Sequence, residues 1–284
     1  VLGTPGCRVH DSRLTSSITK RSHAIILQTV KLIEAEGYDV IYGDTDSVFV
    51  SLQMACDNQQ ATEIGNRLVV LVNRYWQQAL EKEHDLPCYL EMEFETHFNQ
   101  FFMPTVRGSD QGSKKRYAGL IEDEQGNRVI HYKGLETVRT DWTDLAKVFQ
   151  QKLYQLVFDG EAYEDYILLT IDRLFKGEYD SQLKYRKRLR KPLADYIKNI
   201  PPHAQAAIKA ELLFNQMNQP SRYSNRSWIE YVITLSGAET LECQKSKLDY
   251  EHYIERQLTP IADTILTAVK SSMEAVTGQQ QNLF

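Results

Sequence analysis

Two carboxylates separated by one residue, Asp44 and Asp46, are the residues of this sequence best suited to chemistry. Like charges so close together repel each other unless a cation lies beside them. Carboxylate oxygens suit Mg²⁺, which proteins usually hold through one or two carboxylates together with substrate phosphates. Asp-x-Asp is also common at turns, where the side chains only cap the backbone. For an arbitrary Asp-x-Asp the simple turn is the more frequent case, and the apolar strands predicted on either side raise the odds of a metal site.

A block of three cations precedes an aromatic residue further along the chain. Lys114, Lys115 and Arg116 lead directly into Tyr117. Cations at the edge of a strand can contact nucleic-acid phosphates. They can equally form a solvated edge that discourages pairing with another strand. Taken alone, the block favours the solvated edge.

A second basic run covers residues 184–191, with six cations in eight residues and no acid. Its cations are Lys184, Arg186, Lys187, Arg188, Arg190 and Lys191. With Tyr185 and Leu189 as apolar anchors, the run suits a surface that follows duplex phosphates. The alternative is an ordinary solvated helix face.

Periodicity predicts the elements that must position these residues. Asp11 caps a helix over residues 12–35, and residues 40–42 and 48–50 form a β-hairpin around the carboxylate pair. Strict alternation predicts a strand over residues 90–98, with Glu93 and Glu95 on one face. The other predicted elements are helices over 61–82, 141–158, 163–175 and 250–275 (interrupted at Pro260), a hairpin of 117–121 with 129–132, and a strand over 231–235.

The order of these elements predicts an α+β fold in two parts. Residues 1–138 should form an antiparallel sheet with packed helices, and residues 139–284 a mainly helical subdomain. No apolar run approaches the roughly 20 residues of a membrane span. Four scattered cysteines give no zinc or disulfide pattern, which favours a reducing cytoplasm.

Taken at face value, the charge balance argues against a nucleic-acid binder. The chain has 284 residues and a formal net charge of -5, whereas nucleic-acid binders usually carry a basic excess. The cations, however, gather at residues 114–116 and 184–191, and the acids at the hairpin and over residues 81–95. Because binding depends on the local field, an acidic total can coexist with a basic groove.

Four motifs in this order resemble the family B DNA polymerases. Residues 42–47, Tyr-Gly-Asp-Thr-Asp-Ser, look like that family's motif C, and the Lys-Lys-Arg-Tyr block of residues 114–117 looks like its primer-gripping motif. Residues 133–142 are similar to the segment that leads into the thumb, and residues 248–260 resemble the C-terminal helix. The resemblance therefore extends along nearly the whole chain.

The resemblance implies DNA-templated nucleotidyl transfer with two Mg²⁺ ions. Asp46 would bind both ions, and Asp44 would be a supporting acid. Glu93 and Glu95 align loosely with acids near the metal site of relatives. The alternative, in which they only form a solvated face of a strand, has equal weight. The implied substrates are primer–template DNA and deoxynucleoside triphosphates, in the bacterial cytoplasm at the nucleoid. Residues 1–138 would belong to the palm and residues 139–284 would form the thumb.

The resemblance also implies that essential groups are missing from these residues. Family B enzymes carry a motif A aspartate and a motif B lysine before motif C, and neither is present here. We therefore expect a C-terminal palm and thumb fragment that is inactive by itself.

The last five residues, Gln-Gln-Asn-Leu-Phe, fit a pattern by which bacterial polymerases bind the sliding clamp. Gln280, Leu283 and Phe284 would be its recognition residues. Two apolar side chains on a flexible tail suit a hydrophobic pocket.

Two other classes of protein remain as alternatives. A Mn²⁺-dependent glycosyltransferase also uses Asp-x-Asp, but it would not require the basic blocks. A non-catalytic module that binds DNA and tethers the clamp, or an inactivated polymerase relative, would retain them. A motif A aspartate and a motif B lysine upstream would identify a catalytic parent.

Overall fold

The computed structural model describes residues 3–43, 46–54, 56–104, 115–123, 125–223 and 226–281. The chain divides into two compact units, Val1–Asn99 with Leu120–Val129 and Gln100–Gly119 with Ile130–Phe284. Helices alternate with small antiparallel sheets. This mixture confirms the predicted α+β class.

Two long helices, α1 (Ser12–Ala35) and α2 (Asn58–His84), form the frame of the first unit. The Asp11 carboxylate accepts a hydrogen bond from the Arg13 N–H at 2.8 Å and caps α1. The Asp57 carboxylate accepts from the Gln60 N–H at 2.7 Å, and the Gln60 side chain accepts from the Asp57 N–H at 3.3 Å. This reciprocal cap explains why α2 begins at Asn58 rather than at residue 61.

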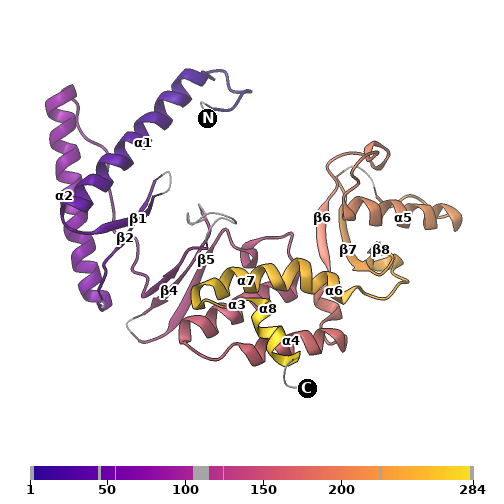
Figure 1. Cartoon of the computed structure of the whole chain (residues 1–284). Helices are drawn as coiled ribbons and strands as arrows, with labels where there is room; N and C mark the ends of the chain where they lie inside the picture. The colour runs from indigo at the N-terminus through magenta and orange to yellow at the C-terminus, as the bar shows by residue number, and fades with distance from the viewer. Residues whose placement is uncertain are drawn as a thin grey trace. The chain divides into compact units, whose positions relative to one another are not determined.

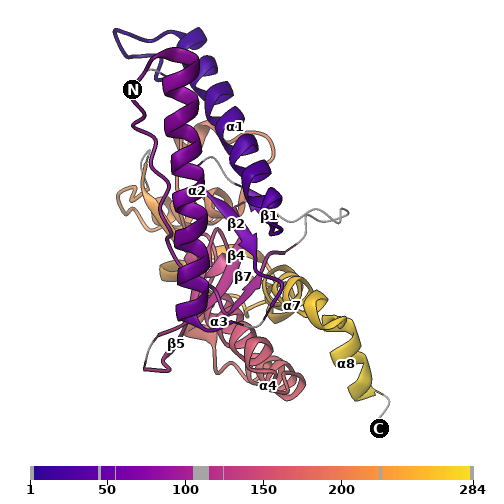
Figure 2. The same cartoon turned by 90° about the vertical axis from the view of Figure 1, so that its left-hand side faces the viewer.

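The predicted hairpin is present as β1 (Asp39–Gly43) and β2 (Val48–Ser51), which pair antiparallel. Its strands lie beside α1 and α2, as both views show (Figures 1 and 2). Three valines from the two strands pack on a small apolar cluster from the helices. The cluster consists of Ile33, Leu68 and Val72, and the strand residues are Val40, Val48 and Val50.

The predicted strand over residues 90–98 is wrong, because these residues pair with no strand among the described residues. Met92 and Phe94 are half-buried, whereas Glu91, Glu93 and Glu95 are exposed, so the alternation itself is real. The Asn73 side chain of α2 binds both the N–H and the carbonyl of Met92, at 2.8 and 3.0 Å. A helix therefore takes the place of a partner strand.

Three further strands form a sheet in the order β3 (Gln100–Phe102), β4 (Tyr117–Glu122) and β5 (Arg128–Lys133). Strands β4 and β5 are the predicted second hairpin. Ala118 and Leu120 of β4 are buried.

The second unit is built around α3 (Asp144–Asp159), whose buried face packs against α7 (Thr259–Leu266). Thr143 caps α3 and Gly160 ends it in the left-handed region. The other α-helices described in this unit are α4 (Glu164–Phe175), α5 (Pro202–Gln216), α6 (Tyr250–Tyr253) and α8 (Met273–Gln281). Short 3-10 helices cover Glu136–Val138, Asp180–Gln182, Leu193–Asp195 and Leu241–Cys243.

The helix predicted over residues 250–275 is interrupted more often than expected. A π-helical turn, Ile254–Leu258, separates α6 from α7, and a 3-10 turn, Thr267–Val269, follows α7. Pro260 has no N–H to donate to the preceding turn, so a regular α-helix cannot continue through it. The π turn lies directly before this interruption; such turns are rare and occur mostly as single turns inside α-helices.

The sheet of the second unit has the order β6 (Tyr185–Arg188), β7 (Trp228–Thr234) and β8 (Gly237–Thr240). Its strands are antiparallel, and α5 packs against them. The basic run thus lies on and beside an edge strand. The run is therefore not a helix, although five of its cations are exposed, as expected of a solvated face.

Candidate functional site

A bulge shapes the carboxylate hairpin. Val40 pairs with Val50 and Tyr42 pairs with Phe49, so Ile41 is the extra residue of β1. The Ile41 side chain is 54% exposed. Bulges bend and twist a strand and are frequent beside functional sites, where they redirect a side chain. Sequence analysis gave no sign of this bulge, because the β-rich pattern runs through it unbroken.

Asp46 is exposed in the turn that joins β1 to β2. Asp44 lies outside the described residues. A Cβ added at Gly43 would meet Ile26 Cγ2 at 3.5 Å, an ordinary contact distance. Packing within this unit therefore does not require glycine here, and its small size leaves room for a ligand to approach the backbone.

The described residues fit one particular kind of metal site. No three His, Cys, Asp or Glu side chains of the described ranges lie together as metal ligands. Asp46 offers a hard, solvent-accessible carboxylate, the donor that Mg²⁺ prefers. Asp46 can thus hold an ion shared with phosphate and water oxygens, but it does not form a closed protein cage.

Glu93 and Glu95 are exposed on the side of their segment opposite Met92 and Phe94. Their orientation follows from the packing of the apolar residues on α2. A role beside a metal ion stays a prediction.

The residues of the basic block occupy different environments. Lys114 lies outside the described part of the chain. Lys115 is exposed and has a positive φ of 67°, and Tyr117 begins β4 with its ring 5.2 Å from that of Phe101. Arg116 instead forms an ion pair with Glu136.

Glu136 is the centre of a largely buried polar network. Its side chain is 11% exposed and accepts from Arg116 Nη2 and, at 2.8 Å, from Gln150 Nε2. Gln150, fully buried on α3, accepts the Thr137 N–H at 2.8 Å. Sequence analysis missed Glu136 and Gln150 as site residues, because nothing in their spacing links them to the basic block.

Four cations of the second basic run already have partners. Lys184 Nζ lies 3.6 Å, and Arg186 Nε 3.9 Å, from the Glu230 carboxylate on β7. Arg188 Nε donates to the Arg226 carbonyl at 2.8 Å. Lys191 Nζ donates to the Asp195 carbonyl and lies 4.7 Å from the Tyr196 ring centre.

Lys187 and Arg190 differ from the other cations of the run. Both are exposed, and neither side chain has a hydrogen bond or ion pair to another residue in the described ranges. Burial lowers the pKa of His203 on α5, and the positive charges of Lys187 and Arg190 lower it further. The two cations therefore produce a positive field at this surface.

A family model for DNA polymerase family B matches residues 8–274. The chain belongs to DNA polymerase family B. It is similar to DNA polymerase II of Escherichia coli strain K12, with 52% identity over 284 residues, which are all of this chain and 36% of that protein. It is also similar to the DNA polymerase alpha catalytic subunit of Drosophila melanogaster, with 25% identity over 95% of this chain and 18% of that protein. DNA polymerase 2 of Aeropyrum pernix is 27% identical over 93% of this chain and 30% of that protein.

This family B chain thus spans about a third of the DNA polymerase II that it matches. The family model includes the carboxylate hairpin and both basic regions. No helix in the described ranges is long and apolar enough to cross a membrane.

The C-terminal tail of the family B chain begins as a helix rather than as the expected flexible segment. The backbone of α8 is helical from Met273 through Gln281, which includes Gln280. Leu283 and Phe284 lie outside the described residues. The clamp-binding pattern stays a prediction.

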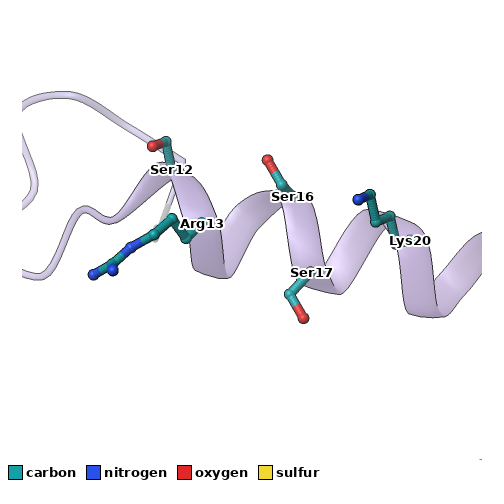
Figure 3. A pocket seen from close by; sticks show the side chains of 5 residues that line it. All are labelled: Ser12, Arg13, Ser16, Ser17 and Lys20. Carbon is teal, nitrogen blue, oxygen red and sulfur yellow. The ribbon is translucent and has the colours of Figure 1, made fainter.

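A polar groove lies along the first turns of α1 (Figure 3). Its lining residues are Ser12, Arg13, Ser16, Ser17 and Lys20. All five belong to one helix, and Arg13 is already paired with Asp11 at 2.8 Å. We assign no ligand to this groove, because no second element of the described chain contributes to its lining.

Proposed function

We propose that this family B chain supplies the carboxylate hairpin and the duplex-holding surfaces of a DNA-directed DNA polymerase. Its substrates would be primer–template DNA and deoxynucleoside triphosphates. The observation that carries the proposal is the exposed Asp46 at the turn of a bulged hairpin, in a chain of this family.

Asp46 would hold Mg²⁺, with Asp44 as a supporting acid and Glu93 and Glu95 as further acids. Bound Mg²⁺ ions would neutralise the triphosphate and activate the primer 3′-hydroxyl. Strands β1 and β2 would keep Asp46 in place, because their valines are packed on the α1–α2 cluster. A two-ion site needs a second carboxylate from another segment, so we propose that the chain alone does not extend a primer.

Lys115 and Tyr117 would hold the duplex near the primer end, with Lys114 beside them. Hydrogen-bond acceptors in the minor groove are nearly the same for every base pair. Cations there can therefore test pairing geometry without reading the sequence, as a polymerase requires.

The 184–191 run would follow duplex phosphates along β6. Lys187 and Arg190 are the leading candidates, because Glu230 partly neutralises Lys184 and Arg186. Such contacts are independent of sequence and weaken with salt.

The C-terminal residues Gln280, Leu283 and Phe284 would bind a bacterial sliding clamp. Removal of Leu283 and Phe284 should then abolish capture by immobilised clamp. Capture that survives the deletion would refute this part of the proposal.

A chimeric polymerase tests the catalytic proposal. These 284 residues would replace the matching segment of E. coli DNA polymerase II, to which they are 52% identical. The chimera should extend a primer, whereas Asp46→Asn should slow extension by about 100-fold or more, because a charge-stabilising group is lost from the reacting centre. Asp39→Asn, also on the hairpin and exposed, is the matched control.

The alternative of a non-catalytic, clamp-tethering DNA-binding module makes a different prediction. The chimera would then fold and bind duplex DNA but would not extend a primer. Equal extension rates for the Asp46→Asn and unmodified chimeras would also contradict the catalytic role.

A further inference from the structure

Arg116 has the environment of a structural residue, although it belongs to a basic block. Its Nη2 is engaged by Glu136, and its Nε is buried without a hydrogen-bond partner among the described residues. A guanidinium available to a phosphate would present these donors to solvent. Only about a third of the side chain, 34%, is exposed.

The neighbouring Lys115 has a backbone conformation that needs support. A lysine with φ of 67° is in the left-handed region, which is unfavourable for a residue with a Cβ. Such conformations persist where the surrounding structure holds them, and they cluster at functional sites. The contacts that hold the Lys115 backbone therefore also determine the direction of its side chain.

Two contacts from the segment after β5 hold this turn. Gly134, with φ of 64°, lies directly against the Lys115 backbone, and an added Cβ would overlap the Lys115 carbonyl oxygen. Two residues later, Glu136 binds Arg116. The segment is fixed in turn to α3, because Gln150 binds both Glu136 and the Thr137 N–H.

We infer that Arg116 is a positioning residue, which acts through Glu136 and Gln150 to hold Lys115 and Tyr117 in their duplex-binding conformation. The inference rests on the proposed duplex binding. It removes Arg116 from the DNA-contacting set and gives Glu136, an acid, a supporting role in binding a polyanion. All of these residues belong to the second unit.

The Glu136→Gln variant of the full chain separates positioning from direct contact. Loss of a negative charge and release of Arg116 should tighten duplex binding if electrostatics alone mattered. We expect instead that the Kd for a primer–template duplex rises about tenfold, since one charged hydrogen-bond pair is lost. Arg173→Ala is the control, because its surface pair with Glu178 is 44% exposed on both sides; its Kd should be unchanged.

Salt dependence tests whether Arg116 acts through Lys115. Each lost phosphate contact lowers the slope of log K against log salt by about 0.9. Lys115→Ala, Arg116→Ala and the double variant should all show the same loss. A loss about twice as large in the double variant (about 1.8) would mean an independent Arg116 contact and would overturn the inference.

Amide hydrogen exchange tests the inference without DNA. In Glu136→Gln, the amides of residues 115–119 should exchange about tenfold faster, because their anchor is lost. Unchanged exchange would contradict positioning. If the unmodified chain failed to bind duplex at all, the proposed function would fail, and hydrogen exchange would still decide the role of Arg116.

Discussion

At the scale of single residues, the cations of the 184–191 run are equivalent in the sequence but differ in the side chains that they contact. Lys184 and Arg186 lie within 4 Å of the Glu230 carboxylate, whereas Lys187 and Arg190 form no ion pair in the described ranges. Lys187 is still close enough to Asp141 to lower the pKa of that carboxyl, after the larger effect of Arg139. An exposed cation that is already paired gains less from a phosphate, because it must first lose its partner. The contribution of the run to duplex binding should therefore be concentrated in two side chains.

Replacement of Lys187 and Arg190 by glutamine should lower the salt slope of duplex binding by about 1.8, or about 0.9 for each lost phosphate contact. Fluorescence anisotropy with a labelled primer–template at several salt concentrations measures the slope. Lys209→Gln is the control, since Lys209 Nζ donates to the Ser236 carbonyl at 2.6 Å on the same unit. Equal slopes in all variants would exclude this surface from phosphate binding.

The residue type of Arg116 does not by itself predict what its side chain contacts. Its place in a Lys-Lys-Arg-Tyr block predicts a DNA contact, and the structure pairs it with Glu136. The two residues are 20 positions apart. Only the return of the chain through β4 and β5 brings them together.

At the scale of elements, residues 90–98 show that alternating side chains do not by themselves indicate a paired strand. Any extended chain places successive side chains on opposite faces. Here Met92 and Phe94 pack toward α2, and Asn73 satisfies the Met92 backbone. The alternation was predictable from the sequence, but the partner was not.

Gly65→Ala should loosen this segment, because an added Cβ would overlap the Phe94 ring. We expect a loss of about 1–3 kcal/mol in the free energy of unfolding from overpacking, partly offset by about 1 kcal/mol of better helix propensity. Urea denaturation together with hydrogen exchange in α2 measures the change. Gly278→Ala in α8 is the control and should not destabilise, because a Cβ added there would have no other atom within 4 Å. A Gly65→Ala chain as stable as the unmodified one would contradict the close packing.

At the scale of the whole molecule, one buried and one half-buried histidine link folding to pH. Burial lowers the pKa of both His203 and His252. Lys187 and Arg190 lower the pKa of His203 further; near His252, Arg256 lowers that pKa and Asp249 and Glu255 raise it. Both groups bind protons more readily in the unfolded chain than in the folded one.

The stability of the chain should therefore fall as the pH decreases below about 6.5, the ordinary histidine pKa. Above this pH both states are neutral, and the two histidines do not make stability depend on pH. Melting temperatures measured between pH 5 and 8 should show the decline, and a His203→Gln/His252→Gln variant should reduce it. Burial also lowers the pKa of His97, which accounts for a remaining decline. His131→Gln, at an exposed position, is the control. An equally steep decline in the double variant would contradict this origin.

The sequence by itself determined the elements whose signals are local. Caps, apolar periodicity and turn residues predict α1, α2, both hairpins, α3 and α4, and four motifs in register indicate the family. Tertiary structure alone decided the bulge at Ile41, the strand that carries the second basic run, and the pairing of Arg116 with Glu136. These features depend on which segments meet across long stretches of chain, and local propensity carries no information about that choice.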